Sequence, residues 1–308
     1  MDSYNCAIAV GTDDEREAFV LAPRSQRAVV LLLHGMAEHK ERYRDIASFL
    51  ARSGFAVVCY DHAGHGVSLP EERRTGLLAR DKGYEKVVDD VVSVREWIGR
   101  EFPDVPCVLV GHSFGSFVAR ECMRRYGERF AAFVFCGTAS HPGIAGSVGR
   151  VLAELAVRVF GPERRSRFFL ALTTGGNNRT VDSPRTAYDW LSRDTDEVDA
   201  YVADPACGFV PCNAFFRDLA TLLLRVTNPR YFASGLPDRP VLLLNGGHDP
   251  VAGMGTAGAR VKTLLTDSGV TNVDTKVYDH ARHELFHEIN RREVFRDLVA
   301  WLRRNIPR

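Results

Sequence analysis

The chain has 308 residues, enough for one large α/β domain or for one domain that carries an insertion. Apolar residues make up 45% and charged residues 26%, and the net charge of +1 gives no overall attraction to nucleic acid or anionic membranes. All apolar runs are shorter than the roughly 18 residues that a membrane-spanning helix needs. The N-terminal residues lack a basic start followed by an apolar core, so we expect a cytoplasmic protein without a signal peptide.

Two strand-like stretches, residues 3–10 and 17–21, open the chain and predict a hairpin. Short, continuous apolar runs then alternate with amphipathic helical periods. Runs of this kind are typical of strands buried on both faces of a parallel sheet. The predicted strands lie at 28–33, 55–60, 107–110, 130–137, within 240–250, and at 273–278; the predicted helices lie at 41–54, 83–100, after 113, at 254–268 and at 284–304. This order predicts an α/β fold, a mostly parallel sheet of eight strands with helices on both faces.

The alternation stops between residues 140 and 236, where only helical periods occur, separated by prolines. We therefore predict a core formed by residues 1–139 and 237–308, and a helical cap, or lid, at 140–236 after the sixth strand. Large apolar side chains of this lid are candidates to hold an acyl chain: Leu152, Leu155, Phe168, Phe169, Phe215, Phe216, Leu219, Leu222 and Leu223. Most of them are expected to form the lid's own core, and some to face the site.

Residues 111–115 read GHSFG, between a predicted strand and a predicted helix. In that setting the serine of G-x-S-x-G sits on a strained turn with its hydroxyl exposed above the sheet edge. Ser113 is therefore the predicted nucleophile. The backbone N–H of Phe114 and that of Met36, in the loop after the strand 28–33, are the predicted donors to an oxyanion.

A serine nucleophile needs a histidine base, and the base needs an orienting acid, both at the carboxyl ends of later strands. Asp249 lies in the loop after the strand within 240–250 and is the predicted acid. Three histidines, His280, His283 and His287, follow the last strand, and spacing alone leaves the choice among them open.

Two other patterns suggest a metal. Residues 283–287 match H-E-x-x-H, in which two histidines one helical turn apart bind zinc. A third ligand is normally needed, and only 21 residues follow His287. Asp61, His62 and His65 lie in a glycine-rich loop, which more commonly hydrogen-bonds to itself. We expect no metal and no organic cofactor.

Seven cysteines, an odd number, are present without zinc-type spacing. Cys59, Cys107 and Cys136 lie in apolar runs, where a thiol is a small core group. Cys207 and Cys212 are close in sequence but do not form a CxxC pair. Free thiols are therefore expected throughout.

Five segments resemble the α/β-hydrolase superfamily, and more narrowly its monoacylglycerol lipase and lysophospholipase group, which is also classed with the serine aminopeptidase-like hydrolases. They are HGMAEH (34–39) followed by Arg42-Tyr43, DHAGHGVS (61–68), GHSFG (111–115), HDPV (248–251) and ARHEL (281–285). The resemblance implies that His283 is the base and Asp249 the acid. Within the same segments, Glu38, His39 and His112 are candidate substrate-binding residues. Ala63 and Ser116 depart from the residues that are commoner in the group.

The resemblance implies a serine ester hydrolase whose substrate is a single-chain acyl ester, with no nucleic acid as partner and at most transient contact of the lid with a membrane or micelle. Two alternatives remain. An exopeptidase of the same fold would hold the substrate ammonium with lid carboxylates, for which the candidates are Glu154, Glu163, Asp189, Asp194, Asp196, Glu197 and Asp199. A non-catalytic small-molecule receptor is the other alternative.

Overall fold

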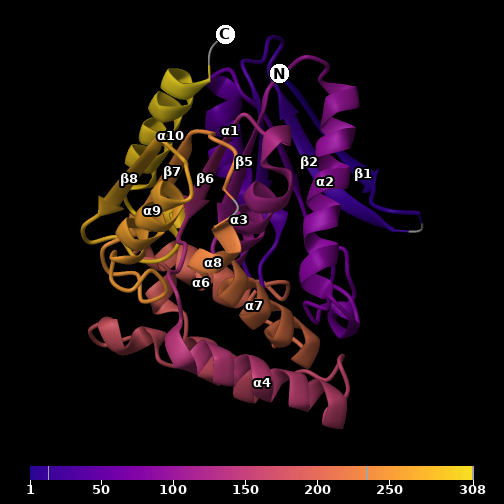
Figure 1. The fold of residues 1–308 in the computed structure, drawn as a ribbon, viewed down its shortest axis with the longest axis vertical. Coiled ribbons are helices and arrows are strands. Elements are labelled where there is room, and N and C mark those ends of the chain that lie inside the picture. Colours follow the sequence, from indigo (N-terminus) through magenta and orange to yellow (C-terminus); the bar gives the residue numbers. More distant parts are fainter. Residues whose placement is uncertain (13, 234, 307–308) are drawn as a thin grey trace.

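The centre of the computed structural model, which describes residues 1–12, 14–233 and 235–306, is a sheet of eight strands (Figure 1). The spatial order is β1-β2-β4-β3-β5-β6-β7-β8. β1 and β2 form an antiparallel hairpin, β2 pairs antiparallel with β4, and all other pairs are parallel. The strands are β1 (Asp2–Ala9), β2 (Glu15–Ala22), β3 (Val29–Leu33), β4 (Ala56–Tyr60), β5 (Cys107–His112), β6 (Ala132–Cys136), β7 (Val241–Gly246) and β8 (Val273–Tyr278). The predicted fold class is confirmed.

Every residue of β3 to β7 is buried, which explains why these strands are apolar without alternation. Successive side chains point to opposite faces and enter two separate cores. In β3, for example, Leu31 and Leu33 belong to one core, and Val30 and Leu32 to the other.

Helices cover both faces of the sheet. α1 (Arg44–Arg52) and α10 (Arg291–Asn305) contribute buried residues to one core, and α2 (Gly83–Glu101), α3 (Phe114–Tyr126) and α9 (Ala257–Asp267) contribute to the other. Single 3₁₀ turns complete the regular structure at η1 (Lys40–Tyr43), η2 (Glu71–Arg73), η3 (Gly127–Arg129), η4 (Asn177–Thr180), η5 (Asp189–Leu191) and η6 (Leu285–His287).

Five α-helices lie in the described chain between β6 and β7: α4 (Gly143–Phe160), α5 (Arg167–Thr174), α6 (Thr195–Ala203), α7 (Asn213–Val226) and α8 (Pro229–Phe232). We call residues 140–236 the inserted segment. Figure 1 shows α4, α6, α7 and α8 at the end of the molecule opposite the two termini, with α4 outermost. Phe215, Phe216 and Leu222 of α7 are buried in the same core as α2 and α3. The division into a core and an independent cap stays a prediction.

One predicted element is wrong. The last helix begins at Arg291, not at 284, so His283 and His287 are not one α-helical turn apart. The physical reason is a set of contacts with the inserted segment. Leu191 O accepts a hydrogen bond from the N–H of Glu284, and Ser192 Oγ donates one to His287 O. These contacts hold the chain away from a helical path.

Candidate active site

Ser113 occupies the turn between β5 and α3, with φ 51° and ψ −119°. This left-handed conformation is strained for a residue other than glycine. The turn is tight because β5 and α3 approach closely: a Cβ at Gly111 would lie 2.2 Å from Gly115 O. The start of α3 is also close to β3, since a Cβ at Gly115 would lie 2.5 Å from Leu33 O. The Ser113 N–H donates to Cys136 O at 2.9 Å, which fixes the turn against β6. Ser113 itself is only half-buried.

The predicted acid and base lie in contact. Asp249, in the loop after β7, places Oδ2 2.9 Å from Nδ1 of His283, in the loop after β8. The other oxygen of Asp249 accepts a hydrogen bond from Val251 N–H at 2.8 Å. Both side chains are buried. His280 is not placed in this way, since its ring faces that of His248.

Two opposing effects set the pKa of His283. Burial alone would lower the pKa, because it disfavours the charged imidazolium. The charge of Asp249 and its hydrogen bond to the ring outweigh burial, and the pKa of His283 is raised above its ordinary value. A carboxylate on Nδ1 also leaves Nε2 as the ring nitrogen that can accept a proton.

The predicted oxyanion donors come from two loops. Phe114 is the first residue of α3, and its ring turns into an aromatic cluster, 5.1 Å from the centre of the Phe215 ring. Met36 lies in the loop after β3, next to Ala37, whose φ is +53°. The carbonyl of Ala37 accepts hydrogen bonds from Tyr201 Oη at 3.0 Å and Gly208 N–H at 2.9 Å. The inserted segment therefore holds this loop in place.

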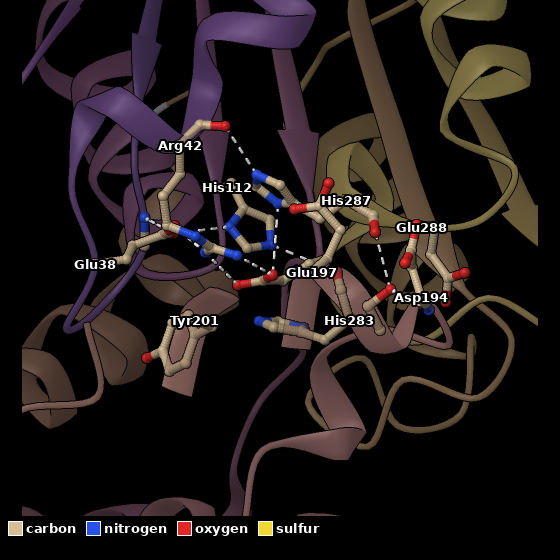
Figure 2. Close-up of polar contacts among 12 residues, drawn as sticks. Glu38, Arg42, His112, Asp194, Glu197, Tyr201, His283, His287 and Glu288 are labelled. Atoms are coloured by element: carbon tan, nitrogen blue, oxygen red, sulfur yellow. Dashed lines mark hydrogen bonds and ion pairs between the residues drawn. The ribbon is translucent and has the colours of Figure 1, made fainter. Parts of the chain in front are cut away.

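A buried polar cluster connects the loop after β3 with the loop after β8 (Figure 2). Glu38 accepts hydrogen bonds from Gly35 N–H at 2.6 Å, Tyr43 Oη at 2.8 Å and Arg42 Nη1 at 2.6 Å. Arg42 also donates to both oxygens of Glu284. Burial would raise the pKa values of Glu38 and Glu284, but the charge of Arg42 outweighs burial and lowers both. Both carboxyl groups are therefore ionised at neutral pH.

His112 lies inside the same cluster. Its Nδ1 lies 2.9 Å from Tyr43 Oη and 3.3 Å from Glu38 Oε1, and its Nε2 lies 3.4 Å from the carbonyl oxygen of His283. His39 lies elsewhere, with Nε2 2.9 Å from Asp204 Oδ2 of the inserted segment. Arg42 and Glu284 lie within two of the family-like segments, but the sequence predicts no role for them. Their opposite charges, in segments that also carry predicted site residues, are the signal that could have indicated the pair.

A partly open pocket of about 450 Å³, solvent at its mouth included, joins these groups. The loops of the sheet contribute Gly35, Met36, Ala37, Glu38, His112, Ser113, His283 and Glu284. The inserted segment contributes Leu170, Thr174, Tyr188, Trp190, Leu191, Tyr201, Gly208 and Phe209. The pocket therefore has one polar wall and one largely apolar wall, the usual form of a small-molecule site.

The apolar lid residues named from sequence do not line this pocket. Phe169, Phe215, Phe216 and Leu222 are buried in the core instead, whereas Leu152, Leu155 and Phe168 are exposed. Trp190, whose ring centre lies 5.1 Å from that of His283, is not among the residues predicted from the sequence. Periodicity identifies the apolar face of a helix, but Trp190 lies in a 3₁₀ turn, where that signal is absent.

The H-E-x-x-H histidines are not arranged as a zinc pair. His287 Nε2 lies 2.9 Å from Arg42 O, and His283 contacts Asp249. Within residues 1–12, 14–233 and 235–306, only His39, Asp204 and Cys207 bring three potential ligand atoms within 4.8 Å of one another. The seven cysteines are free thiols, Cys207 and Cys212 included.

Comparison with known proteins places this geometry in a family. The family profile described as "Serine aminopeptidase, S33" matches residues 24–290. The chain belongs to this family. Monoacylglycerol lipase of Mycolicibacterium smegmatis is 28% identical over 284 residues, covering 90% of this chain and 88% of that protein. Human monoglyceride lipase is 28% identical over 278 residues, covering 86% of this chain and 81% of that protein.

Solved structures agree with the family. A thermostable carboxyl esterase from Bacillus coagulans superposes with a TM-score of 0.91 at 25% identity, with both chains covered in full. A monoglyceride lipase from Saccharomyces cerevisiae superposes with a TM-score of 0.74 at 17% identity. The fold is the α/β-hydrolase fold. Across the described residues, no helix combines the length and apolar character that crossing a membrane requires.

Proposed function

We propose that this protein is a serine carboxylic ester hydrolase that acts on single-chain acyl esters such as monoacylglycerols. The observation that carries the proposal is the shared pocket: Ser113 on its strained turn and His283, itself paired with Asp249, both line it. The names of the relatives, monoacylglycerol lipase and carboxyl esterase, support the same reaction class.

In the proposed mechanism, Ser113 Oγ attacks the ester carbonyl while His283 Nε2 takes the hydroxyl proton. Asp249 orients the imidazole and stabilises its charged form. The N–H groups of Met36 and Phe114 bind the oxyanion of the tetrahedral intermediate. Collapse of the intermediate expels the alcohol, which receives the proton from His283. Water, deprotonated by His283, then releases the acid from Ser113.

The apolar wall supports an acyl chain as the bound group. Leu170, Trp190, Leu191 and Phe209 of the inserted segment line the pocket opposite the polar residues. At about 0.8 kcal/mol per buried CH₂ group, a chain of eight or more carbons supplies several kcal/mol of binding free energy. The polar wall with Glu38 and His112 then faces the alcohol part of the ester.

The exposed face of α4 supports transient contact with a lipid surface. Ile144, Val148, Val151, Leu155 and Val159 follow one another at helical spacing, and each is at least half-exposed. An apolar stripe of this kind binds the interface of a membrane or micelle without spanning it. Substrate dissolved in such an interface would then meet the pocket directly.

The exopeptidase alternative has less support. The only carboxylates on the described pocket wall are Glu38 and Glu284, and both are paired with Arg42. The seven lid carboxylates named from sequence do not line the pocket, and three of them have partners elsewhere: Asp189 the N–H of Arg185, Asp194 the side chain of Arg291, and Asp199 that of Arg185. None of them is free at the pocket to hold an ammonium group.

Purified protein assayed with p-nitrophenyl esters of graded chain length, monoacylglycerols and an aminoacyl anilide tests the proposal. We expect ester turnover that increases with chain length, and a loss in kcat of roughly 10⁴–10⁶ for Ser113→Ala. Ser93→Ala, at a half-buried serine of α2 outside the pocket, is the matched control. Hydrolysis of the anilide alone, or ester turnover that survives Ser113→Ala, would contradict the proposal.

The base and the zinc alternative are tested separately. His283→Ala should abolish activity, whereas His280→Ala, in the same loop, should not. If only a variant of His280 or His287 were inactive, the assignment of the base would be wrong. A fluorophosphonate should inactivate the enzyme and a chelator should not; the reverse result would favour a metal mechanism.

A further inference from the structure

Arg120, on the α3 helix that follows the serine turn, is a cation buried to 1% exposure. Among the residues that the structure describes, no carboxylate pairs with it. Burial without a counter-ion is costly for a charged group. It lowers the pKa of Arg120 to about 9, far below the ordinary value of an arginine.

The guanidinium group is only partly satisfied. Nη1 donates to Thr138 Oγ1 at 3.3 Å and Ala139 O at 2.9 Å, and Nη2 donates to Val226 O. Nε is buried and has no hydrogen-bond partner in the described part of the chain. Since arginine has five N–H donors, two remain without an acceptor. Nε and Nη2 share one edge of the guanidinium group, and such an edge is suited to a bidentate oxyanion.

Arg120 lines a cavity that is separate from the candidate active site. The cavity holds about 1030 Å³, solvent at its mouth included, and lies between α8 and α9. Aliphatic side chains form much of its wall: Pro229 and Ala233 on one side, Val261 and Leu264 on the other. Arg260 at the exposed rim adds a second positive charge, and Asp267 is the one acidic lining residue.

Four hydroxyl side chains line this cavity, and all but that of Ser140 already donate to a backbone carbonyl. Thr227 donates to Leu223 O, Thr263 to Ala259 O and Ser268 to Leu264 O, each within its own helix or at that helix's end. Inorganic phosphate would leave the aliphatic wall of the cavity uncovered. A carboxylate needs only the two N–H groups that Arg120 has free, and an attached alkyl chain would find the aliphatic wall.

We propose that this cavity is a second binding site, for the carboxylate of a single-chain anionic amphiphile such as a medium-chain fatty acid. Since Nε is closed off from solvent in this structure, the carboxylate reaches the edge that Nε shares with Nη2 after a local side-chain shift at the base of the cavity, and the alkyl chain lies between α8 and α9. Of the carbonyl groups that hold Arg120, that of Ala139 immediately precedes the inserted segment, and that of Val226 belongs to the last residue of α7. Pairing the buried charge should therefore stabilise both contacts.

Crystals grown with 8-bromooctanoate test the location directly, because the anomalous signal of bromine marks the chain. We expect bromine between α8 and α9 with the carboxylate on Arg120. In solution, the protein is first treated with a long-chain fluorophosphonate to fill the candidate active site. Octanoate should then raise the melting temperature, whereas octanol, acetate and inorganic phosphate at equal concentration should have little effect.

Matched variants on α9 identify the site in solution. Thr263→Glu places a negative charge in the cavity at an exposed position, and Thr266→Glu places the same charge on the same helix outside it. We expect octanoate affinity to fall about tenfold or more for T263E and less than about twofold for T266E. Arg120→Lys, which keeps the charge but removes the Nε–H, should also weaken binding. If this variant does not fold, the comparison of T263E with T266E still tests whether octanoate binds in the cavity.

Several outcomes would overturn the proposal. Bromine found only in the pocket of Ser113 would place the carboxylate there instead. Equal effects of T263E and T266E would exclude the cavity. If octanol bound with the same affinity as octanoate, the site would not recognise the negative charge. If acetate or phosphate bound with the same affinity as octanoate, the site would not recognise the alkyl chain.

Discussion

Glu284 and Arg42, 242 positions apart in the sequence, form a two-point ion pair in which Nη1 lies 2.7 Å from Oε1 and Nη2 lies 2.6 Å from Oε2. The side chains are 9% exposed for Arg42 and 4% for Glu284. Glu284 follows the proposed base directly, and Arg42 also binds Glu38 of the loop that carries Met36. One arginine thus connects the base loop with the oxyanion loop.

Replacing Arg42 with methionine should destabilise the protein strongly. The variant leaves Glu38 and Glu284 buried without their cation, and removing one partner of a buried pair typically costs about 3–5 kcal/mol. Urea denaturation followed by circular dichroism measures the loss. Arg44→Met is the control, since Arg44 is 40% exposed in its pair with Glu41 and should contribute no more than about 1 kcal/mol. Equal losses for both variants would contradict the role of Arg42.

Tyr201→Phe should lower catalysis more than stability. The variant removes the hydroxyl that donates to Ala37 O but keeps the ring, whose centre lies 4.8 Å from the Arg42 guanidinium. One hydrogen bond is worth about 1 kcal/mol, so kcat should fall about fivefold with little change in KM. Steady-state kinetics with a monoacylglycerol provide the measurement. Tyr188→Phe, which removes a hydroxyl bonded to Gly208 O, is the comparison and should affect kcat less.

Activity should depend on pH through His283. The neutral imidazole is the base, and Asp249 raises the pKa of His283, so kcat/KM should fall with decreasing pH through a midpoint above the ordinary value of about 6.5. Rates of acid release, measured by chromatography from pH 5 to 9, give this midpoint. A midpoint well below 6.5 would contradict the pairing of His283 with Asp249.

The ion pair between His283 and Asp249 affects the stability of the fold in the opposite direction: it stabilises the fold more at low pH than at high pH. A raised folded-state pKa contributes stability that is fully present below the unfolded pKa and is lost as pH rises through the folded pKa. The enzyme is therefore expected to be most active at a pH at which the His283–Asp249 pair no longer contributes to stability.

Asp249→Asn removes the charge that raises the pKa of His283, so burial of the ring dominates. The midpoint of the residual activity should then move to lower pH, with kcat reduced by about 10⁴.

The α4 face should govern binding to lipid surfaces. Val148→Glu combined with Val151→Glu puts two charges on the exposed apolar stripe and should reduce co-flotation with phosphatidylcholine vesicles severalfold, because each charge must be desolvated at the interface. Turnover of a soluble short-chain ester should stay unchanged. Thr266→Glu combined with Ala300→Glu adds the same charge at exposed positions of α9 and α10 and should leave flotation intact. A similar loss in both double variants would contradict a role for α4.

The local elements of this protein follow from the sequence alone. Continuous apolar runs identify the buried strands, since a parallel sheet covered on both faces has no polar side. GHSFG fixes the turn at Ser113, because Gly111 and Gly115 have no room for a side chain. The segments HDPV and ARHEL single out Asp249 and His283, which the structure places 2.9 Å apart.

Only the tertiary structure decided what the inserted segment contacts. Hydrophobic periodicity marks which face of a helix is buried but not its partner, so the pocket wall with Trp190 and Tyr201 was not foreseen. The start of the last helix was mispredicted for the same reason: Leu191 and Ser192, nearly a hundred residues upstream, bind residues 284 and 287 by hydrogen bonds. The pairing of Arg42 with Glu284, and the burial of Arg120 away from every carboxylate of the described residues, result from contacts between segments far apart in the sequence. Local sequence patterns do not specify such contacts.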